Sequence, residues 1–331
     1  MDTPIGLGIS CYNDVKLIEQ LLESIITKTN FTGDYHILVV DDGTKDKKML
    51  DDLAMRCHIY DADLVLNEEN RGIPYTWNRI VKTLHKRHKC ENIVILNNDL
   101  VVLDNNWLQR LVFFLDNNDK IGTVGLGLVQ VDHRTGQLVE YDSQSFGDKP
   151  AKVGCATGCA FAIKKSVWEK VKNPDSSIGW FSGLKSFHEE IFMGFKLAEL
   201  GYVSYMLPYP PGFAHWGGAT FMMNLKLTEM KLPTSKEIGI PIDKNEYIRV
   251  IKASKIYPEA WKKDRIVWQN DKGEDMVDRM SFSRYLFAKY WNVLENYDAP
   301  QIPVHERIVT PIPPRKVKWL DKDLNVREAI V

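Results

Sequence analysis

The chain has 331 residues, which is enough for one large α/β domain or for one such domain with a substantial appendage. Its 43 basic residues nearly balance its 44 acidic residues, so the overall charge does not favour sustained attraction to nucleic acid or to an anionic membrane. Five cysteines without metal-ligand spacing, and no stretch of about 18 apolar residues, indicate a cytoplasmic protein with reduced cysteines and no integral membrane segment.

The first hundred residues alternate between short apolar runs and segments with helical periodicity. Short β-branched runs are typical of buried strands, whereas Ile18, Leu21, Leu22 and Ile25 recur at the spacing of one helix face. The pattern predicts strands at 5–11, 36–40 and 62–66, a fourth strand within 93–102, and helices at 15–27, 47–57, 74–88 and 105–114. Because short loops join them, we expect right-handed crossovers and a parallel sheet with helices on both faces.

Polar residues follow each of these strands. The four polar ends are Tyr12-Asn13-Asp14, Asp41-Asp42, Asn67 to Asn70 and Asn97-Asn98-Asp99. Since the carboxyl ends of parallel strands share one edge of a sheet, the four ends predict a single cleft. The first turn lacks a Gly-x-Gly-x-x-Gly sequence, which disfavours a dinucleotide seated on a helix N-terminus.

The triplet Asn97-Asn98-Asp99 has two interpretations. One carboxylate after two amides, on a rigid strand end, suits a hard cation that takes its other oxygen ligands from water and a diphosphate. The same residues would also form an ordinary polar β-turn.

The second half of the chain continues the α/β pattern with less regularity. It predicts strands at 121–131 and 202–207, an apolar segment at 154–163, helices at 165–171 and 189–200, and a glycine-rich and aromatic loop at 173–187 that lines the cleft. Helices follow near 247–255 and 281–294. The last thirty residues contain several prolines and read as an extended arm.

The order of these motifs resembles that of family 2 glycosyltransferases of the GT-A fold, the group that includes bacterial rhamnosyltransferase-like enzymes. The resemblance covers about residues 5–218. It implies a Rossmann-like nucleotide-diphospho-sugar transferase fold with a mostly parallel central sheet, helices on both faces and a C-terminal helical or extended appendage. The implied domains are a glycosyltransferase domain at 1–220, with a nucleotide-sugar-binding half at 1–104 and an acceptor-binding half at 105–220, and a C-terminal extension at 221–331.

The resemblance assigns the donor pocket to several segments. Ser10-Cys11-Tyr12-Asn13, Val40-Asp41-Asp42-Gly43-Thr44 and Asn70-Arg71-Gly72 match family motifs in order. A carboxylate at a strand end can accept hydrogen bonds from a uracil N3–H or from ribose hydroxyls. The implied nucleotide-sugar-binding residues are Ser10, Tyr12, Asn13, Asp41, Asp42, Gly43, Asn70, Arg71, Gly72, Asn78, Asn97 and Asn98.

The metal site implied by the resemblance consists of Asp99 and His215. Asn97 replaces the first aspartate of the family's Asp-x-Asp element, so Asp99 carries the carboxylate. An imidazole ligand favours Mn²⁺ over Mg²⁺. A lone histidine before a tryptophan is otherwise usually structural.

The resemblance places the catalytic base in the acidic pair that opens the helix at 189. Glu190 is the implied base and Glu189 the alternative, although acidic residues in a first helical turn also simply favour the helix dipole. The expected acceptor-side residues are Trp180, Phe181, His188 and Trp216. For the two aromatic residues at 180–181, hydrophobic packing is an equally good explanation.

The expected function is a metal-dependent, inverting hexosyl or pentosyl transfer from a nucleoside-diphosphate sugar, with UDP favoured, to a saccharide or glycoconjugate hydroxyl. Arg315-Lys316-Val317-Lys318-Trp319 mixes charge with an aromatic residue, so a hydroxylated base in DNA is an alternative acceptor. A non-catalytic nucleotide-sugar-binding protein is the alternative of another class. The C-terminal region could also mediate a homo-oligomer.

Overall fold

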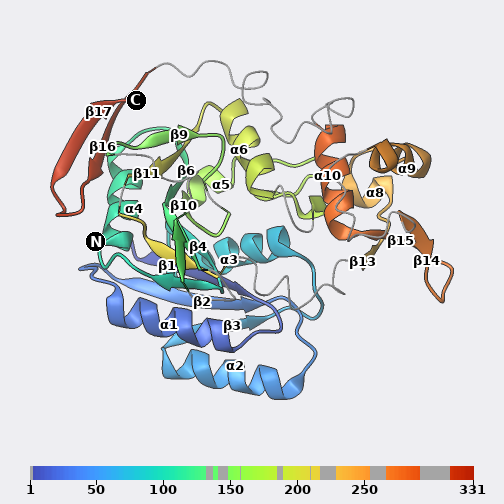
Figure 1. Cartoon of the computed structure of the whole chain (residues 1–331), viewed down its shortest axis with the longest axis horizontal. Coiled ribbons are helices and arrows are strands. Elements are labelled where there is room, and N and C mark those ends of the chain that lie inside the picture. The colour runs from blue at the N-terminus through green and yellow to red at the C-terminus, as the bar shows by residue number, and fades with distance from the viewer. Residues whose placement is uncertain are drawn as a thin grey trace.

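The computed structural model describes residues 3–131, 137–140, 148–156, 158–184, 189–208, 210–216, 229–253, 266–290 and 314–331. Its centre is an eight-stranded sheet with the strand order β3-β2-β1-β4-β10-β6-β11-β9 (Figure 1). The N-terminal elements are β1 (Ile5–Cys11), α1 (Lys16–Lys28), β2 (Tyr35–Asp41), α2 (Lys47–Ile59), β3 (Ala62–Leu66), α3 (Ile73–His88) and β4 (Asn92–Asn97). β3, β2, β1 and β4 pair in parallel, which confirms the predicted alternation and sheet.

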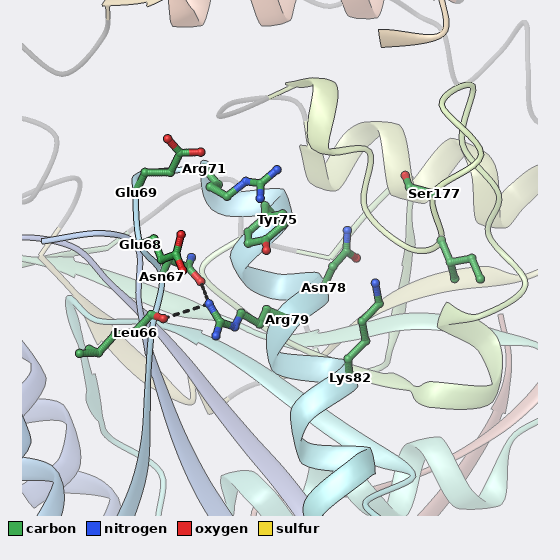
Figure 2. Close-up of a pocket in the computed structure, with 11 residues that line it drawn as sticks. Leu66, Asn67, Glu68, Glu69, Arg71, Tyr75, Asn78, Arg79, Lys82 and Ser177 are labelled. Carbon is green, nitrogen blue, oxygen red and sulfur yellow. Dashed lines mark hydrogen bonds between the residues drawn. The ribbon is translucent and has the colours of Figure 1, made fainter. Parts of the chain in front are cut away.

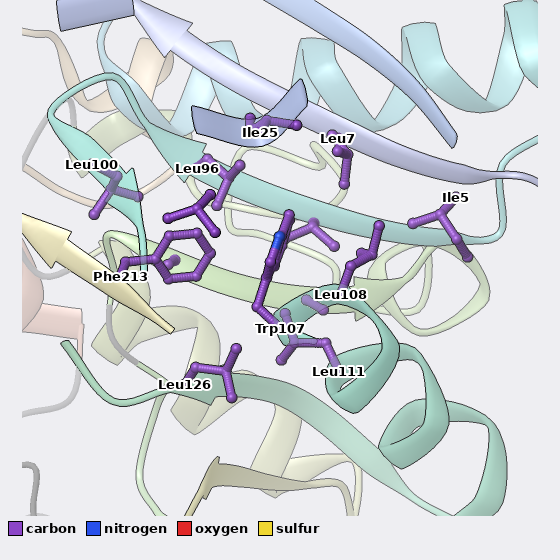
Figure 3. Close-up of a cluster of buried hydrophobic side chains, with 14 of the residues drawn as sticks. Ile5, Leu7, Ile25, Leu96, Leu100, Trp107, Leu108, Leu111, Leu126 and Phe213 are labelled. Carbon is purple, nitrogen blue, oxygen red and sulfur yellow. The ribbon is translucent and has the colours of Figure 1, made fainter. Parts of the chain in front are cut away.

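Alternate residues of the strands bury opposite faces of the sheet. Val94 and Leu96 of β4 join a cluster with α1 and the helix at 107–117, part of which Figure 3 shows. Ile93 and Ile95 join a second cluster with α3. On β1, glycine allows α3 to lie close to the strand, because a Cβ at Gly8 would lie 2.0 Å from a methyl carbon of Ile80. The strands therefore read as continuous apolar runs because both of their faces are covered.

The second half adds strands of both directions. Its elements are β5 (Leu100–Val102), α4 (Trp107–Asn117), β6 (Ile121–Leu126), β7 (Leu128–Val131), β8 (Leu138–Glu140), β9 (Ala151–Val153), β10 (Ala160–Lys164), α5 (Lys165–Trp168), the 3₁₀ turn η2 (Ser182–Leu184), α6 (Glu189–Glu199), β11 (Val203–Leu207) and β12 (Phe213–His215). β10 lies antiparallel between β4 and β6, and β11 is parallel to β6. The sheet is therefore mostly parallel rather than wholly parallel.

Two of the predicted apolar runs each divide into two strands. A turn at residues 98–99 separates β4 from β5, and residue 127 separates β6 from β7. The second strand of each run joins a separate four-stranded sheet with the order β5-β12-β7-β8. The single strand predicted at 121–131 is therefore wrong, because the chain changes sheet in the middle of a continuous apolar segment.

The C-terminal part packs onto this framework in two places. Its elements are β13 (Glu229–Lys231), α8 (Ser235–Ile238), α9 (Lys244–Ala253), β14 (Val267–Gln269), β15 (Asp275–Asp278), α10 (Arg279–Tyr290), β16 (Lys316–Leu320) and β17 (Val326–Ile330). Phe282, Leu286 and Phe287 of α10 form an apolar cluster with Phe192 and Phe195 of α6. This segment lies beside α6 in Figure 1, so it supports the helix that begins with the acidic pair.

The end of the chain is a β-hairpin and not the extended arm that the prolines suggested. β16 and β17 pair antiparallel, and the hairpin lies against α4 (Figure 1). Val317 and Trp319 of β16 are buried in the cluster that includes Leu111 and Phe114 of α4. The expectation of an arm is thus corrected for residues 316–330, because alternate residues of β16 contribute to the main core.

Candidate donor-binding and catalytic site

The carboxyl ends of β1, β2 and β4 lie side by side at one edge of the central sheet. Parallel register places Cys11 opposite Asp41 and Ser10 opposite Asn97. Ser10, Tyr12 and Asn97 are half-buried, so each keeps a face toward solvent. The polar residues that follow these strands therefore converge on one cleft edge.

Asp41 organises the turn after β2. Its carboxylate accepts hydrogen bonds from the backbone N–H of Gly43 at 3.0 Å, the N–H of Thr44 at 2.8 Å and the Thr44 hydroxyl at 2.6 Å. Thr44 Oγ1 accepts a further bond from the N–H of Asn13 at 2.9 Å. Burial raises the pKa of Asp41, and the hydrogen bonds from Thr44 and Gly43 oppose that rise. Asp41 therefore fixes the relative position of the turns after β1 and β2.

Asp42 holds the loop that follows β3. One carboxylate oxygen accepts hydrogen bonds from Asn67 Nδ2 at 2.8 Å and from the N–H of Arg71 at 2.9 Å. The other oxygen accepts from the N–H of Gly72 at 2.8 Å. Hydrogen bonds to a charged group contribute about 1.5–3 kcal/mol each, so this one carboxylate sets the shape of the 67–72 loop.

Gly43 allows this loop to approach the turn after β2. Its φ is +88°, and a Cβ at this position would lie 2.2 Å from the carbonyl carbon of Glu69. Any side chain would therefore push the 67–72 loop away from the β2 turn.

Asn78 uses its side-chain atoms inside the protein. Its amide nitrogen donates to the carbonyl of Trp180 at 2.7 Å, while its amide oxygen accepts from the N–H of Trp180 at 2.8 Å and from Trp168 Nε1 at 2.9 Å. Asn78 thus joins α3 to the chain at 180, and it also lines a pocket along α3.

A pocket of about 590 Å³ lies along the exposed side of α3 (Figure 2). Arg71, Tyr75, Arg79 and Lys82 line it from α3 and its approach, and Ser177 faces them from the 173–179 loop. The Arg71 guanidinium lies 4.2 Å from the centre of the Tyr75 ring. Neither the end of β1 nor that of β4 lines this pocket, so it is separate from the predicted donor residues at those strand ends.

Asp99 and His215 come together from different strands. Asp99 lies in the turn between β4 and β5, and β12 pairs with β5 so that His215 is opposite Leu100. The His215 Nε2 atom is 3.3 Å from Asp99 Oδ1. Asn98, beside Asp99, is also buried in this turn. The β-turn and the cation site are therefore compatible, because the turn presents the carboxylate.

This pair suits a divalent cation. Among the residues that the structure describes, Asp99 and His215 are the two side chains that could contact an ion here, and no cluster of three or more His, Cys, Asp or Glu side chains occurs in that part of the chain. Oxygen atoms from water or a diphosphate would supply the rest. Burial opposes protonation of His215, but contacts with Asp99 and Cys159 outweigh it and raise its pKa to about 10. A bound cation would replace that proton between the two side chains.

Two adjacent residues connect this pair with the acidic pair of α6. The Cys159 Sγ atom lies 4.0 Å from His215 Nδ1, on the other side of the ring from Asp99. A Cβ at Gly158 would lie 3.3 Å from the carboxyl carbon of Glu190. The carbonyl of Cys159 also accepts a hydrogen bond from the N–H of Asn97 at 2.8 Å. Glu190 and His215 thus lie next to two adjacent residues, Gly158 and Cys159.

The two glutamates occupy different environments. Glu190 is half-buried, whereas Glu189 is 6% exposed and its Oε2 atom has no hydrogen-bond partner in the described chain. Burial, and then the charge of Glu190, raise the pKa of Glu189 well above its usual value. Burial also raises the pKa of Glu190. Glu190 therefore combines access to solvent with increased basicity, which are the two properties that a general base requires.

Glu189→Gln is expected to stabilise the protein at neutral pH. The folded state retains a proton on Glu189 that the unfolded chain releases above about pH 4.5, so the stability that depends on this proton is complete below pH 4.5 and falls as pH rises towards the folded-state pKa. Glutamine avoids this loss. The gain in unfolding free energy, measured with urea, should be small at pH 5 and about 1 kcal/mol or more at pH 8.

The exposed Glu23 on α1 offers a matched control for this measurement. Glu23→Gln should show no comparable dependence on pH. A gain for Glu189→Gln that is equal at pH 5 and pH 8 would contradict the buried-proton explanation.

Trp180 and Phe181 do not line an acceptor site in this structure. Trp180 is 1% exposed and packs edge-on against Trp77, and Phe181 is fully buried against Phe192. The expectation that they stack on a ligand is therefore corrected in favour of packing, since neither ring has a free face.

Trp216 lies closer to the site. The backbone N–H of Trp216 donates to the backbone carbonyl of Asp99 at 2.9 Å, which links the chain after β12 to the β4–β5 turn. In the described chain its buried Nε1 atom has no hydrogen-bond partner. His188, the remaining acceptor-side prediction, lies outside the described residues.

Arg110 supports the site and was not anticipated. Its guanidinium is fully buried on α4, where it bonds Asp104 at 2.6 Å, the carbonyl of Pro210 at 2.9 Å and the carbonyl of Pro208. These carbonyls lie in the turn that leads into β12, so Arg110 positions the strand that carries His215. The sequence gives no local signal for this role, because Arg110 and the prolines before β12 are about a hundred residues apart.

The terminal hairpin does not offer the basic and aromatic surface suggested for DNA. Trp319 is 4% exposed and packs inward. Lys316 and Lys318 both pair with Glu328 on the neighbouring strand. Trp319 therefore cannot stack on a base, and both lysines have a carboxylate neighbour within the hairpin, which disfavours the DNA alternative.

The described helices include none whose length and apolar character would allow it to cross a membrane. Residues 7–171 match the family model described as Glycosyl transferase family 2. Glu189, Glu190 and His215 lie beyond that match. No curated protein matches the sequence at a significant level.

Two solved structures are similar to this chain at low sequence identity. S. aureus TarS 1-349 in complex with UDP-GlcNAc is 14% identical with a TM-score of 0.48, and the alignment covers 64% of this chain and 58% of that one. GalNAc-T7 with UDP, GalNAc and Mn²⁺ is also 14% identical, with a TM-score of 0.53, and the alignment covers 96% of this chain and 60% of that one. The chain thus spans about 60% of the length of these structures. Residues 7–171 thus resemble a Glycosyl transferase family 2 domain, and the likeness to GalNAc-T7 indicates that the chain has a GT-A fold.

Proposed function

We propose that the protein is a metal-dependent, inverting glycosyltransferase that moves a sugar from a UDP-sugar to a hydroxyl of a saccharide or glycoconjugate. The observation that supports this most strongly is the arrangement around residues 158–159. The half-buried Glu190 lies against Gly158, and His215 of the Asp99–His215 pair lies against Cys159. Binding alone would not require a carboxylate of raised pKa beside a cation site, so this arrangement favours an enzyme over a nucleotide-sugar-binding protein.

The proposed reaction is a single displacement. Glu190 accepts the proton of the acceptor hydroxyl while the oxygen attacks the anomeric carbon of the donor. The bond from that carbon to the diphosphate breaks on the opposite face, so configuration inverts and UDP is released. No covalent enzyme intermediate is needed, because one carboxylate is sufficient for a single displacement.

The other residues hold and orient the donor. Asp99 and His215 would hold a divalent ion, with Mn²⁺ favoured, which when bound supplies positive charge to the departing diphosphate. The turns fixed by Asp41 and Asp42 shape the nucleoside end. The turn after β1, with Ser10, Tyr12 and Asn13, contributes to the same end of the donor site.

The donor is expected to stabilise the protein in a metal-dependent way. A ligand at 100 times its Kd adds about 2.7 kcal/mol to the free energy of unfolding. This gain should raise the Tm by a clearly measurable amount. Thermal shifts with UDP-, GDP- and dTDP-sugars, each with and without Mn²⁺, should single out a UDP-sugar, and UDP should then be released when a saccharide acceptor is added.

The competing classes predict different results. Stabilisation by a UDP-sugar without UDP release on any saccharide would favour a binding protein. Stabilisation by NADH instead would contradict the proposal. Transfer only in the presence of DNA, with steep salt dependence, would restore the DNA alternative.

A further inference from the structure

Arg279 brings the C-terminal part of the chain to the strand-end cleft. It is the first residue of α10, and its Nη1 atom donates to Asn70 Oδ1 at 2.7 Å although the two residues are 209 positions apart. Asn70 lies in the loop whose shape is set by Asp42. The family match ends at residue 171, so this arginine lies outside the part of the chain that the family pattern describes.

The Arg279 guanidinium has unused hydrogen-bond donors among the described residues. It carries five N–H groups, and among the described residues its one hydrogen bond is to Asn70. Its Nε atom is buried without a partner in that part of the chain. Asp42 does not use these donors, because its oxygens accept from Asn67 and from the backbone of residues 71 and 72. Arg279 as a whole is half-buried, so a ligand oxygen could accept from the guanidinium donors that Asn70 leaves unused.

The surroundings keep the guanidinium cationic and in place. Burial lowers the pKa of Arg279, while the nearby Asp42, Tyr12 and Asp278 act in the opposite direction. Asp278 Oδ1 accepts the N–H of Ser281 at 2.8 Å and so fixes the first turn of α10. The aromatic cluster between α10 and α6 anchors the rest of the helix. Arg279 is therefore held before any ligand arrives.

Its neighbours identify the end of the donor that it faces. Asn70 follows β3, Asp42 follows β2 and Tyr12 follows β1, whereas Asp99 follows β4. In the strand order β3-β2-β1-β4, Arg279 therefore lies on the side away from the cation site. A donor whose diphosphate is at Asp99 and His215 extends its nucleoside towards Arg279.

We propose that Arg279 is a specificity residue that donates hydrogen bonds to the carbonyl oxygen O4 of a uracil base. This rests on the proposed function, since it deepens the description of the same donor site. Uracil presents an acceptor at position 4, where cytosine presents an amino donor, so a guanidinium attracts the first and repels the second. The C-terminal segment would thus select the nucleotide as well as support the helix that carries Glu190.

The test is calorimetric titration of UDP and CDP, both with Mn²⁺, into wild type, Arg279→Ala and Arg279→Lys. The alanine variant should bind UDP about 10-fold more weakly or worse, and CDP with little change, so that the preference for UDP over CDP collapses. The lysine variant keeps the charge but loses the planar fork, so an intermediate loss is expected. Arg249→Ala, an exposed arginine on α9 of the same segment, should leave both affinities unchanged.

Three other results would overturn the assignment. An equal loss for UDP and CDP would place the contact at the ribose or the diphosphate. A lower Tm with both affinities unchanged would make Arg279 only a structural link to Asn70. If the wild-type protein binds no UDP, the proposal that a UDP-sugar is the donor is wrong. This result is distinguishable from failure of the Arg279 assignment, because it is obtained without any substitution. If Arg279→Ala does not fold, the ratio of the UDP and CDP affinities of Arg279→Lys tests the assignment instead. A ratio equal to that of wild type would then contradict it.

Discussion

Glu190→Gln is expected to lower kcat by about 10²–10⁴-fold and to leave the Kd for the UDP-sugar nearly unchanged. This is the usual contribution of a general base, and glutamine is close in shape to glutamate but cannot take the acceptor proton. Steady-state rates of UDP release and calorimetric donor binding measure the two quantities. Glu199→Gln, an exposed position at the far end of α6, serves as the matched control and should retain the wild-type rate.

The pH profile gives the same assignment a second readout. Because burial raises the pKa of Glu190 above its usual value of 4.5, the fall of kcat/KM on the acidic side should lie above that pH in wild type. The rate should increase as pH rises through the raised pKa, since the base must be deprotonated. If Glu190→Gln turns over at the wild-type rate, or keeps the same acidic limb, another residue is the base.

Asp99→Ala is expected to abolish the Mn²⁺-dependent activity. His215 alone would remain of the two protein ligands, and metal stabilisation of a departing diphosphate is worth several kcal/mol, so the rate should fall on the order of 100-fold or more. Calorimetric titration of Mn²⁺ in the presence of UDP should show that the cation no longer binds measurably. This readout does not depend on catalysis.

Asp119→Ala is the matched control for this prediction, because Asp119 is an exposed aspartate just after α4. It should keep both the rate and the Mn²⁺ affinity of wild type. Full activity of Asp99→Ala that EDTA still removes would show that the cation is held elsewhere.

The first half of the fold could be predicted because its signals are local. β2 and β4 are β-branched runs covered on both faces, and α1 shows its buried stripe directly in the residues that include Leu21 and Leu22. Each element therefore carries its own pattern, and short loops limit how neighbouring elements can connect. The convergence of the polar strand ends follows from the parallel topology.

The features that were missed depend on distant parts of the chain. The apolar run at 121–131 does not show that its second half pairs with β12. The prolines near the C-terminus give no indication that Trp319 is buried, because its burial depends on α4. Trp180 looks equally suited to a ligand or a core until Trp77 and Asn78 are placed beside it. Arg279 carries no local signal, because its partner lies in a loop more than two hundred residues earlier.

The aromatic cluster between α6 and α10 sets the size of the unit that can be exchanged between related enzymes. Phe192 and Phe195 on α6 face Phe282 and Phe287 on α10 within one continuous apolar layer. A chimaera joined just after the family match would place a foreign aromatic surface against the helix of Glu190. Grafts should therefore move residues 189–290 as one block, which carries both the proposed base Glu190 and the proposed nucleotide contact Arg279.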